Sequence, residues 1–545
     1  MKPKNELLFL ALGGSAEIGM NVNLYGCDGK WVMVDLGMTF SDPAYPGIDL
    51  ILPDLEFIEK QSKNLLGIVL THGHEDHIGA VPYFAAELGV PLFATPFTAG
   101  LIRRKLAEAG LENDVELRII PNEGSFELGP FGFRYLPIAH SIAEGNALLI
   151  DTPYGKIFHT GDWKLDDEPM LGTPSTPEQL SAIGDDGVLA MVCDSTNVFN
   201  KEGSGSEGDV YRNLMRVVDG LKNRVLVTTF ASNAARLQTL GEVAKHSGRQ
   251  LCVAGRSLDR MIENSRENGY LKDFPATVDF EDAMHIPRDE IMIIATGGQG
   301  EARAALGRIA GDSHKIKLTE GDNVLFSSKQ IPGNEIAIGR IQNQLAAKGV
   351  VMITDRQEHI HVSGHPGRPE LAKMYDWIRP EIIVPVHGEI RHMKEQARFA
   401  AEQGVPKNIF QQNGDVVRLA PDGPKIIGQE RTGRLVLDGD VIITADGKTL
   451  NERRKIGYNG TISVAVGLND KGKISGQPVL RLLGVPLEED EEEFLDEMGD
   501  MIIDKFKKPI GDMDRFSEEL RLLVRRSATE WTGKKPIVSV LIVEA

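Results

Sequence analysis

One stretch, Thr71-His72-Gly73-His74-Glu75-Asp76-His77-Ile78-Gly79-Ala80, constrains this chain more than any other feature. It follows an apolar run, residues 66–70, that has the pattern of a buried strand. Because α/β folds place their sites at strand ends, the cluster is predicted to lie on a loop leaving that strand. Imidazole and carboxylate groups with no thiolate nearby suit Zn²⁺ or Mn²⁺. The alternative, a solvated His-rich loop, explains this density of ligands poorly.

Length and composition narrow the class of protein. A chain of 545 residues is too long for one ordinary core, so two to four domains are expected. The net charge of −19 argues against a general polyanion binder, although a local basic channel or bound cations can offset it. The cysteines at positions 27, 193 and 252 match no ligand spacing, which favours a reduced, cytoplasmic protein. No signal peptide and no membrane-spanning run is recognised, so no membrane association is expected.

Further candidate ligands follow other apolar runs. His140 ends the run 133–139, and Asp162 follows Gly161 at the end of a predicted strand. The two oxygens of a carboxylate can each bind one ion, so Asp162 can bridge two metals. Asp35 ends another strand, and two roles stay open for it: a turn cap, or a residue that orients a metal ligand.

The order of these residues resembles a known superfamily. His-x-His-x-Asp-His, then a lone His, then Gly-Asp, is similar to the metallo-β-lactamase superfamily. Later segments resemble the bacterial ribonuclease J family of β-CASP nucleases, and the similarity runs from about Leu8 to the C-terminus. These segments are residues 192–197, 227–233, 255–257, 295–301, 326–328, 331–335 and 359–365. Residues 385–389, Pro-Val-His-Gly-Glu, supply the last metal ligand of that family, His387.

The expected fold class is α/β. A metallo-β-lactamase αββα sandwich carries an inserted parallel α/β β-CASP domain, and a small C-terminal α/β domain follows. Within residues 205–355, apolar strands alternate with helical stretches such as 234–245 and 300–310, which is typical of a parallel unit. This unit is predicted to be an insertion, because His387 lies beyond it and is needed for the site. The predicted boundaries are 1–200 and 356–430 for the sandwich, 201–355 for the β-CASP domain, 431–465 for a linker and 466–545 for the C-terminal domain.

These residues suggest a two-metal hydrolase. His72, His74 and His140 would bind one ion, and Asp76, His77 and His387 the other, with Asp162 between them. Zn²⁺ is the expected metal, with Mn²⁺ or Mg²⁺ as alternatives, and the site would lie in the cleft where the two domains meet. His365 is the expected general acid for the leaving 3′-oxygen, with Asp194 as its orienting partner. For Asp194 the alternative role is a helix N-cap before Ser195.

The resemblance also implies the substrate and the assembly. In the family, two segments hold a phosphate near the site; here they comprise Ala231, Ser232, Asn233, His361, Val362, Ser363, Gly364 and His365. The implied activity is 5′→3′ exonuclease action on 5′-monophosphorylated RNA, together with endonuclease action, in RNA maturation and decay. The alternative for Ser363-Gly364 is an ordinary tight turn. The C-terminal domain is implied to support a homodimer or a higher homo-oligomer.

Other functions compete with this hypothesis. A β-CASP enzyme could also cut single-stranded DNA. A small-molecule hydrolase of the metallo-β-lactamase type would need neither an inserted domain nor His365. An inactive RNA-binding scaffold would have no reason to keep seven candidate metal ligands.

Overall fold

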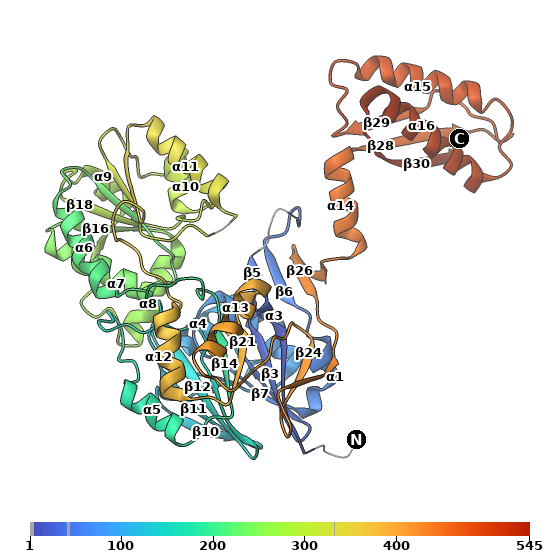
Figure 1. Cartoon of the computed structure of the whole chain (residues 1–545). Helices are drawn as coiled ribbons and strands as arrows, with labels where there is room; N and C mark the ends of the chain where they lie inside the picture. Colours follow the sequence, from blue (N-terminus) through green and yellow to red (C-terminus); the bar gives the residue numbers. More distant parts are fainter. Residues whose placement is uncertain (1–4, 41–43, 332, 545) are drawn as a thin grey trace. The chain divides into compact units, whose positions relative to one another are not determined.

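A computed structural model of the chain describes residues 5–40, 44–331 and 333–544 (Figure 1). The described residues form two compact units. One contains residues up to 39 together with 52–433, and the other contains the residues from 434 onward with the short stretch before residue 52. No helix in the described part of the chain is long and apolar enough to cross a lipid bilayer.

Two sheets of the first unit pack face to face. The eight-stranded sheet has the order β25 (Lys425–Gln429), β24 (Asp415–Ala420), β1 (Leu7–Gly13), β3 (Val22–Cys27), β4 (Lys30–Val34), β7 (Leu65–Val69), β8 (Leu92–Ala94), β9 (Leu117–Ile119). The seven-stranded sheet has the order β10 (Ser125–Leu128), β11 (Phe131–Pro137), β12 (Asn146–Thr152), β13 (Gly155–His159), β14 (Ala190–Asp194), β21 (Ile382–Val386), β23 (Lys407–Asn408). Phe9 and Val69 of the first sheet share one core with Phe133 and Val384 of the second. This shared core is why the central strands are almost uniformly apolar.

Helices accompany both sheets and complete the αββα sandwich. Leu180, Leu371 and Phe399 pack with Phe158 and Met191 of the second sheet. They belong to α5 (Pro177–Asp185), α12 (Arg368–Ile378) and α13 (Ile390–Glu402). Helices α3 (Val81–Leu88) and α4 (Pro96–Ala109) accompany the first sheet. They contact each other, and α4 also contacts β9. The predicted fold class is confirmed.

A third sheet lies within the first unit, in the green-to-yellow part of Figure 1. Its strands are all parallel, in the order β17 (Thr277–Val278), β16 (Gln250–Ala254), β18 (Ile291–Ala295), β15 (Val225–Thr228), β19 (Asn323–Phe326), β20 (Val351–Thr354). The longer helices of this sheet are α6 (Glu207–Asp219), α7 (Ala234–His246), α8 (Arg256–Glu267) and α11 (Glu335–Ala347). The strands before and after this segment, β14 and β21, pair in parallel with Asp194 opposite Val386. The segment is therefore an insertion between two neighbouring strands of the sandwich.

One predicted helix is shorter than expected. The sequence predicts a helix over residues 300–310, but α10 spans only Ala305–Ala310. Gly300 has a φ of 89°, which a right-handed helix does not allow. A Cβ at Gly300 would lie 2.6 Å from the Cβ of Ala337, so the turn packs tightly against α11.

The second unit ends in a small α/β domain. Its three-stranded sheet has the order β29 (Val479–Leu483), β28 (Thr461–Leu468), β30 (Ile537–Glu544), and its helices are α15 (Glu491–Lys505) and α16 (Met513–Thr532). Ile462 and Val464 pack against Phe494 and Leu520 of these helices. Before this domain come the hairpin β26 (Arg434–Asp438) and β27 (Val441–Thr444) and the helix α14 (Lys448–Asn459). The predicted boundary at residue 466 falls inside β28, and the other predicted boundaries stay predictions.

Candidate metal centre

The predicted ligands converge from the ends of different strands. His72 and His74 lie on the loop after β7, and Asp76 and His77 lie on the one-turn helix α2 (Glu75–Ile78). The cluster is therefore half loop and half helix, whereas the sequence predicts a loop throughout. His140, Asp162 and His387 follow β11, β13 and β21. Their potential ligand atoms form two groups, each within 4.8 Å, that share Asp162.

The first group holds three imidazoles and one carboxylate. Nε2 of His72 and Nε2 of His140 each lie 3.1 Å from Nδ1 of His74. Oδ2 of Asp162 lies 3.9 Å from Nε2 of His72 and from Nε2 of His140. Around a tetrahedral zinc ion with Zn–N bonds of about 2.0–2.1 Å, ligand nitrogens are roughly 3.3 Å apart. The donor set and the spacing therefore fit one divalent cation.

The second group is richer in carboxylates. Nε2 of His387 lies 3.1 Å from Oδ2 of Asp76, and Nε2 of His77 lies 3.3 Å from Oδ1 of Asp162. Oδ1 of Asp162 is buried and makes no hydrogen bond of good geometry among the described residues, although the imidazole nitrogens of His77 and His387 lie 3.3 and 3.4 Å away. An oxygen left this way is costly unless a cation binds it. The two oxygens of Asp162 thus face different groups, as a bridging ligand requires.

Hydrogen bonds orient these imidazoles. Nδ1 of His77 donates to Oδ2 of Asp35 at 2.7 Å, and Nδ1 of His140 donates to the Gly364 carbonyl at 2.6 Å. Each bond engages Nδ1, so Nε2 is the nitrogen that would bind a metal; Nε2 of His77 also lies 3.1 Å from the side-chain amide of Asn21. Asp35 is fully buried and also accepts from the amide of Thr71, at 2.8 Å. Both roles left open for Asp35 thus occur together, since it fixes the turn after β7 and orients a candidate ligand.

The pKa values of the imidazoles also differ between the first and the second ligand group. Burial lowers the pKa of His74 to about 4 and that of His140 to about 3, so both are neutral near pH 7 and can donate a lone pair. Burial also opposes charging of His77 and His387, but Asp162 is the first of several carboxylates that raise the pKa of both well above its usual value. The carboxylates of the second group therefore create a negative potential at these rings, and the same potential favours a bound cation.

His365 and Asp194 lie beside the two groups. Nδ1 of His365 is 2.7 Å from Oδ2 of Asp194. Burial lowers the pKa of His365, but Asp194 and Asp162 together raise it, and the net pKa is above its usual value. Oδ1 of Asp194 accepts from the amide of Thr196 at 2.8 Å. Residues 196–199 form a turn, so Asp194 caps a turn rather than a helix and holds His365 at the same time.

The two predicted phosphate-binding segments are joined by a buried arginine. Arg236, in the first turn of α7, is completely buried and binds both carboxylate oxygens of Glu207 at 2.6 and 3.0 Å. Its guanidinium also donates to the carbonyl of Ile360 at 3.0 Å. This arginine ties residues 231–233, which precede α7, to residues 361–365. Sequence reasoning missed Arg236 and Glu207, since no local pattern marks a buried pair between distant residues.

Individual side chains in these segments have different surroundings. Oδ1 of Asn233 accepts from the amide of Arg236 at 2.8 Å and so caps α7, and Ala231 packs against the hydrophobic core of the inserted domain. Val362 lies in that core, which leaves only its backbone for a substrate. Oγ of Ser363 accepts from the amide of His365 at 3.1 Å, which fixes the turn. Ser232 and His361 are half-buried.

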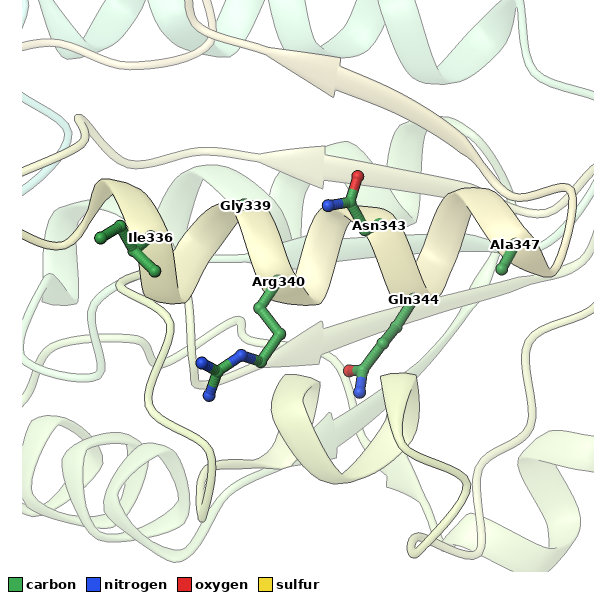
Figure 2. Close-up of a pocket in the computed structure, with 6 residues that line it drawn as sticks. All are labelled: Ile336, Gly339, Arg340, Asn343, Gln344 and Ala347. Atoms are coloured by element: carbon green, nitrogen blue, oxygen red, sulfur yellow. The ribbon is translucent and has the colours of Figure 1, made fainter. Parts of the chain in front are cut away.

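A surface hollow lies elsewhere, along α11. Figure 2 shows the residues that line it: Ile336, Gly339, Arg340, Asn343, Gln344 and Ala347. All of them belong to one helix, and none is a predicted site residue. The hollow therefore does not mark the metal centre.

Four family models match successive parts of the chain. Their descriptions are metallo-beta-lactamase superfamily (residues 20–187), Ribonuclease J, beta-CASP domain (222–345), Zn-dependent metallo-hydrolase RNA specificity domain (350–410) and Ribonuclease J C-terminal domain (448–545). Ribonuclease J of Sinorhizobium meliloti is 39% identical over 100% of this chain and 98% of its own length. The chain belongs to the ribonuclease J family.

Other comparisons agree with this ribonuclease J assignment. Ribonuclease J of Corynebacterium glutamicum is 35% identical over 99% of this chain and 76% of its own length. That of Thermus thermophilus is 30% identical over 99% and 96%. A solved structure of a protein of unknown function from Enterococcus faecalis has a TM-score of 0.55 and 17% identity over 76% of this chain and 100% of its own, which shows the shared fold alone.

Membership of the ribonuclease J family makes the chain a metal-dependent nuclease. It weighs against the small-molecule hydrolase, and the two ligand groups weigh against an inactive scaffold.

Proposed function

We propose that the chain is a two-metal ribonuclease that degrades 5′-monophosphorylated RNA from its 5′ end and also cleaves RNA internally. The observation that carries this proposal is the pair of ligand groups that share Asp162, with His365 beside them. Nitrogen and oxygen ligands without thiolates favour Zn²⁺, with Mn²⁺ or Mg²⁺ as alternatives. Bound there, two divalent cations supply the positive charge that polarises the scissile phosphate and makes water acidic enough to attack it near neutral pH.

The chain's own residues supply the remaining chemistry. Burial opposes charging of His365, but Asp194 and Asp162 raise its pKa overall, which favours a protonated ring whose Nε2 can give a proton to the leaving 3′-oxygen. Asp194 holds Nδ1 of the same ring, so the ring cannot turn away. His140 is held by the carbonyl of Gly364, and this links the phosphate-binding segment to the first ligand group.

Local electrostatics support a phosphate pocket at residues 231–233 and 361–364. Burial comes first among the causes that lower the pKa of His361, and Arg236, Lys329 and Lys164 lower it further. A positive potential therefore acts on this segment in spite of the overall negative charge of the chain. The N-terminus of α7 lies beside Asn233, and backbone amides at a helix start favour an anion.

We expect 5′-monophosphorylated RNA to be degraded about tenfold or more faster than 5′-triphosphorylated or 5′-hydroxyl RNA, since one lost charge-assisted hydrogen bond costs about 1.5–3 kcal/mol. The measurement compares the decay of three RNAs of identical sequence that differ only at the 5′ end. A 5′ label should appear first in a mononucleotide. Equal decay rates for the three RNAs would contradict the 5′-phosphate pocket. The amount of internally cut fragments measures how much of the cleavage is endonucleolytic.

We also propose that the C-terminal domain forms a homodimer through its sheet. One face of the sheet packs on α15 and α16, and the other exposes apolar side chains. Val479, Leu483, Leu541 and Val543 are 66%, 58%, 57% and 56% exposed. Ala465 lies opposite both Val479 and Leu541, so these residues share one face, which also carries Ser463, Arg481 and Ser539 one pair further along. A second copy of the same face would cover it.

Leu541→Asp should convert the dimer into monomers, because an unpaired charge would be buried in the interface, weakening association by about 100-fold or more. Light scattering at a fixed protein concentration gives the mass. Met501→Asp is the matched control, since Met501 is 37% exposed but lies on α15. A monomeric wild-type chain, or a Leu541→Asp chain that stays dimeric, contradicts this proposal.

A further inference from the structure

An exposed aromatic side chain lies close to the metal centre and has no part in the proposed chemistry. Phe199 is 48% exposed. The guanidinium of Arg391 lies 6.0 Å from the centre of its ring, and the ring of His392 lies 5.3 Å away. Ile390, beside Arg391 in the sequence, is 44% exposed. The result is a small surface with an aromatic ring, a cation and an apolar rim.

Short connections tie this surface to the metal centre. Oγ of Thr196 is 2.9 Å from Nδ1 of His387, and the side chain of Asn197 donates to the carbonyl of His365 at 3.2 Å. Phe199 comes two residues after Asn197, and Arg391 comes four residues after His387. Four residues span at most about 14 Å, which corresponds to a few nucleotides of extended RNA.

Three neighbouring imidazoles connect the phosphate-binding segment with this surface. The ring centre of His365 lies 5.4 Å from that of His140 and 5.5 Å from that of His387. The phosphate-binding segment adjoins His140 through the carbonyl of Gly364. The turn that carries Phe199 contacts His387 through Thr196 and the carbonyl of His365 through Asn197. A strand whose 5′ phosphate is held beside His140 would run past His365 and the metal ligands before it reached Phe199.

We propose that Phe199 and Arg391 form a stacking platform for a base of the RNA strand on the 3′ side of the scissile linkage. The proposal rests on the ribonuclease function above. Aromatic rings and guanidinium planes are the groups on which unpaired bases stack, and they accept any base. Arg391 also adds positive charge, which favours a polyanion over an uncharged apolar partner.

The test uses 5′-monophosphorylated RNAs of one sequence, each with a single abasic nucleotide at a different position near the 5′ end. In the wild type, one abasic position should lower kcat/KM by about 5- to 100-fold, the range expected for the loss of one stacked base. Phe199→Ala should degrade intact RNA that much more slowly and should no longer respond to that abasic position. Phe199→Tyr should restore the wild-type profile.

Tyr458→Ala is the matched control, because Tyr458 is also an exposed aromatic residue beside a cation. Its side chain is 72% exposed, and Nζ of Lys534 lies 4.0 Å from the centre of its ring. Tyr458 belongs to the second unit, whereas the metal centre belongs to the first. It should keep the wild-type profile. If the wild type digests RNA but Phe199→Ala shows the same abasic profile, the stacking platform is wrong while the ribonuclease function still holds. The surface would then be a candidate binding site for a protein partner instead. If the wild type leaves RNA intact, both proposals fail.

Discussion

Asp162→Asn abolishes RNA cleavage and reduces metal binding at both groups; this is the largest effect we expect from any single substitution. Asp162 is the one residue that both groups share, and each of its oxygens faces a different group. An amide has one carbonyl oxygen and no negative charge, so it cannot bind two cations. Metal ions supply several kcal/mol of transition-state stabilisation, so turnover should fall by about 10³-fold or more.

The measurement pairs metal content per chain with the initial rate of RNA cleavage. Asp151→Asn is the control, since Asp151 is exposed on β12 and lies outside both ligand groups. It should keep full metal content and full rate. An Asp162→Asn chain that binds two ions per chain and cuts RNA at the wild-type rate would show that Asp162 is not the bridge.

His365→Ala leaves the bound metal unchanged and lowers turnover by about 10²–10⁴-fold, the usual contribution of a general acid. The ring of His365 is bound at Nδ1 by Asp194 and lies beside both groups without being needed to complete either. Its effect should therefore appear in kcat, while metal content stays the same. Asp194→Asn should weaken the same step, because it removes the charge that raises the pKa of His365.

His246→Ala serves as the control for this substitution, because His246 is an exposed residue at the end of α7. The outcome that decides the role of His365 is the metal content. Asp162, Asp194, His365 and His387 also form a group with ligand spacing. Loss of metal from His365→Ala would therefore make His365 a ligand and remove the general acid from the mechanism.

The sequence could predict that these candidate ligands cluster, because most of them follow local rules. His72, His74, Asp76 and His77 lie close together in the chain, and the others end apolar strands. His387 lies far from the other ligands in the sequence. Because the site needs it as a ligand, its position also predicted that the parallel domain is an insertion. The sheet confirms this, because β14 and β21 are neighbours across the inserted segment.

The parts that sequence reasoning missed depend on tertiary contacts. The predicted helix at 300–310 begins late because Gly300 packs against α11, and periodicity cannot show that contact. The buried pair of Arg236 and Glu207 joins two predicted phosphate-binding segments, yet each residue reads as an ordinary polar helix position. The use of the Gly364 carbonyl to orient His140 likewise depends on a backbone atom that carries no sequence signal.

The most direct test of the central claim is a metal titration of the chain after complete removal of metal, with bound ions counted and RNA cleavage measured in the same samples. The account predicts that cleavage reaches its maximum at two divalent ions per chain and that chelation reverses it. Full activity with one ion per chain would contradict the shared-ligand centre. RNA left intact at every metal loading would contradict the account as a whole.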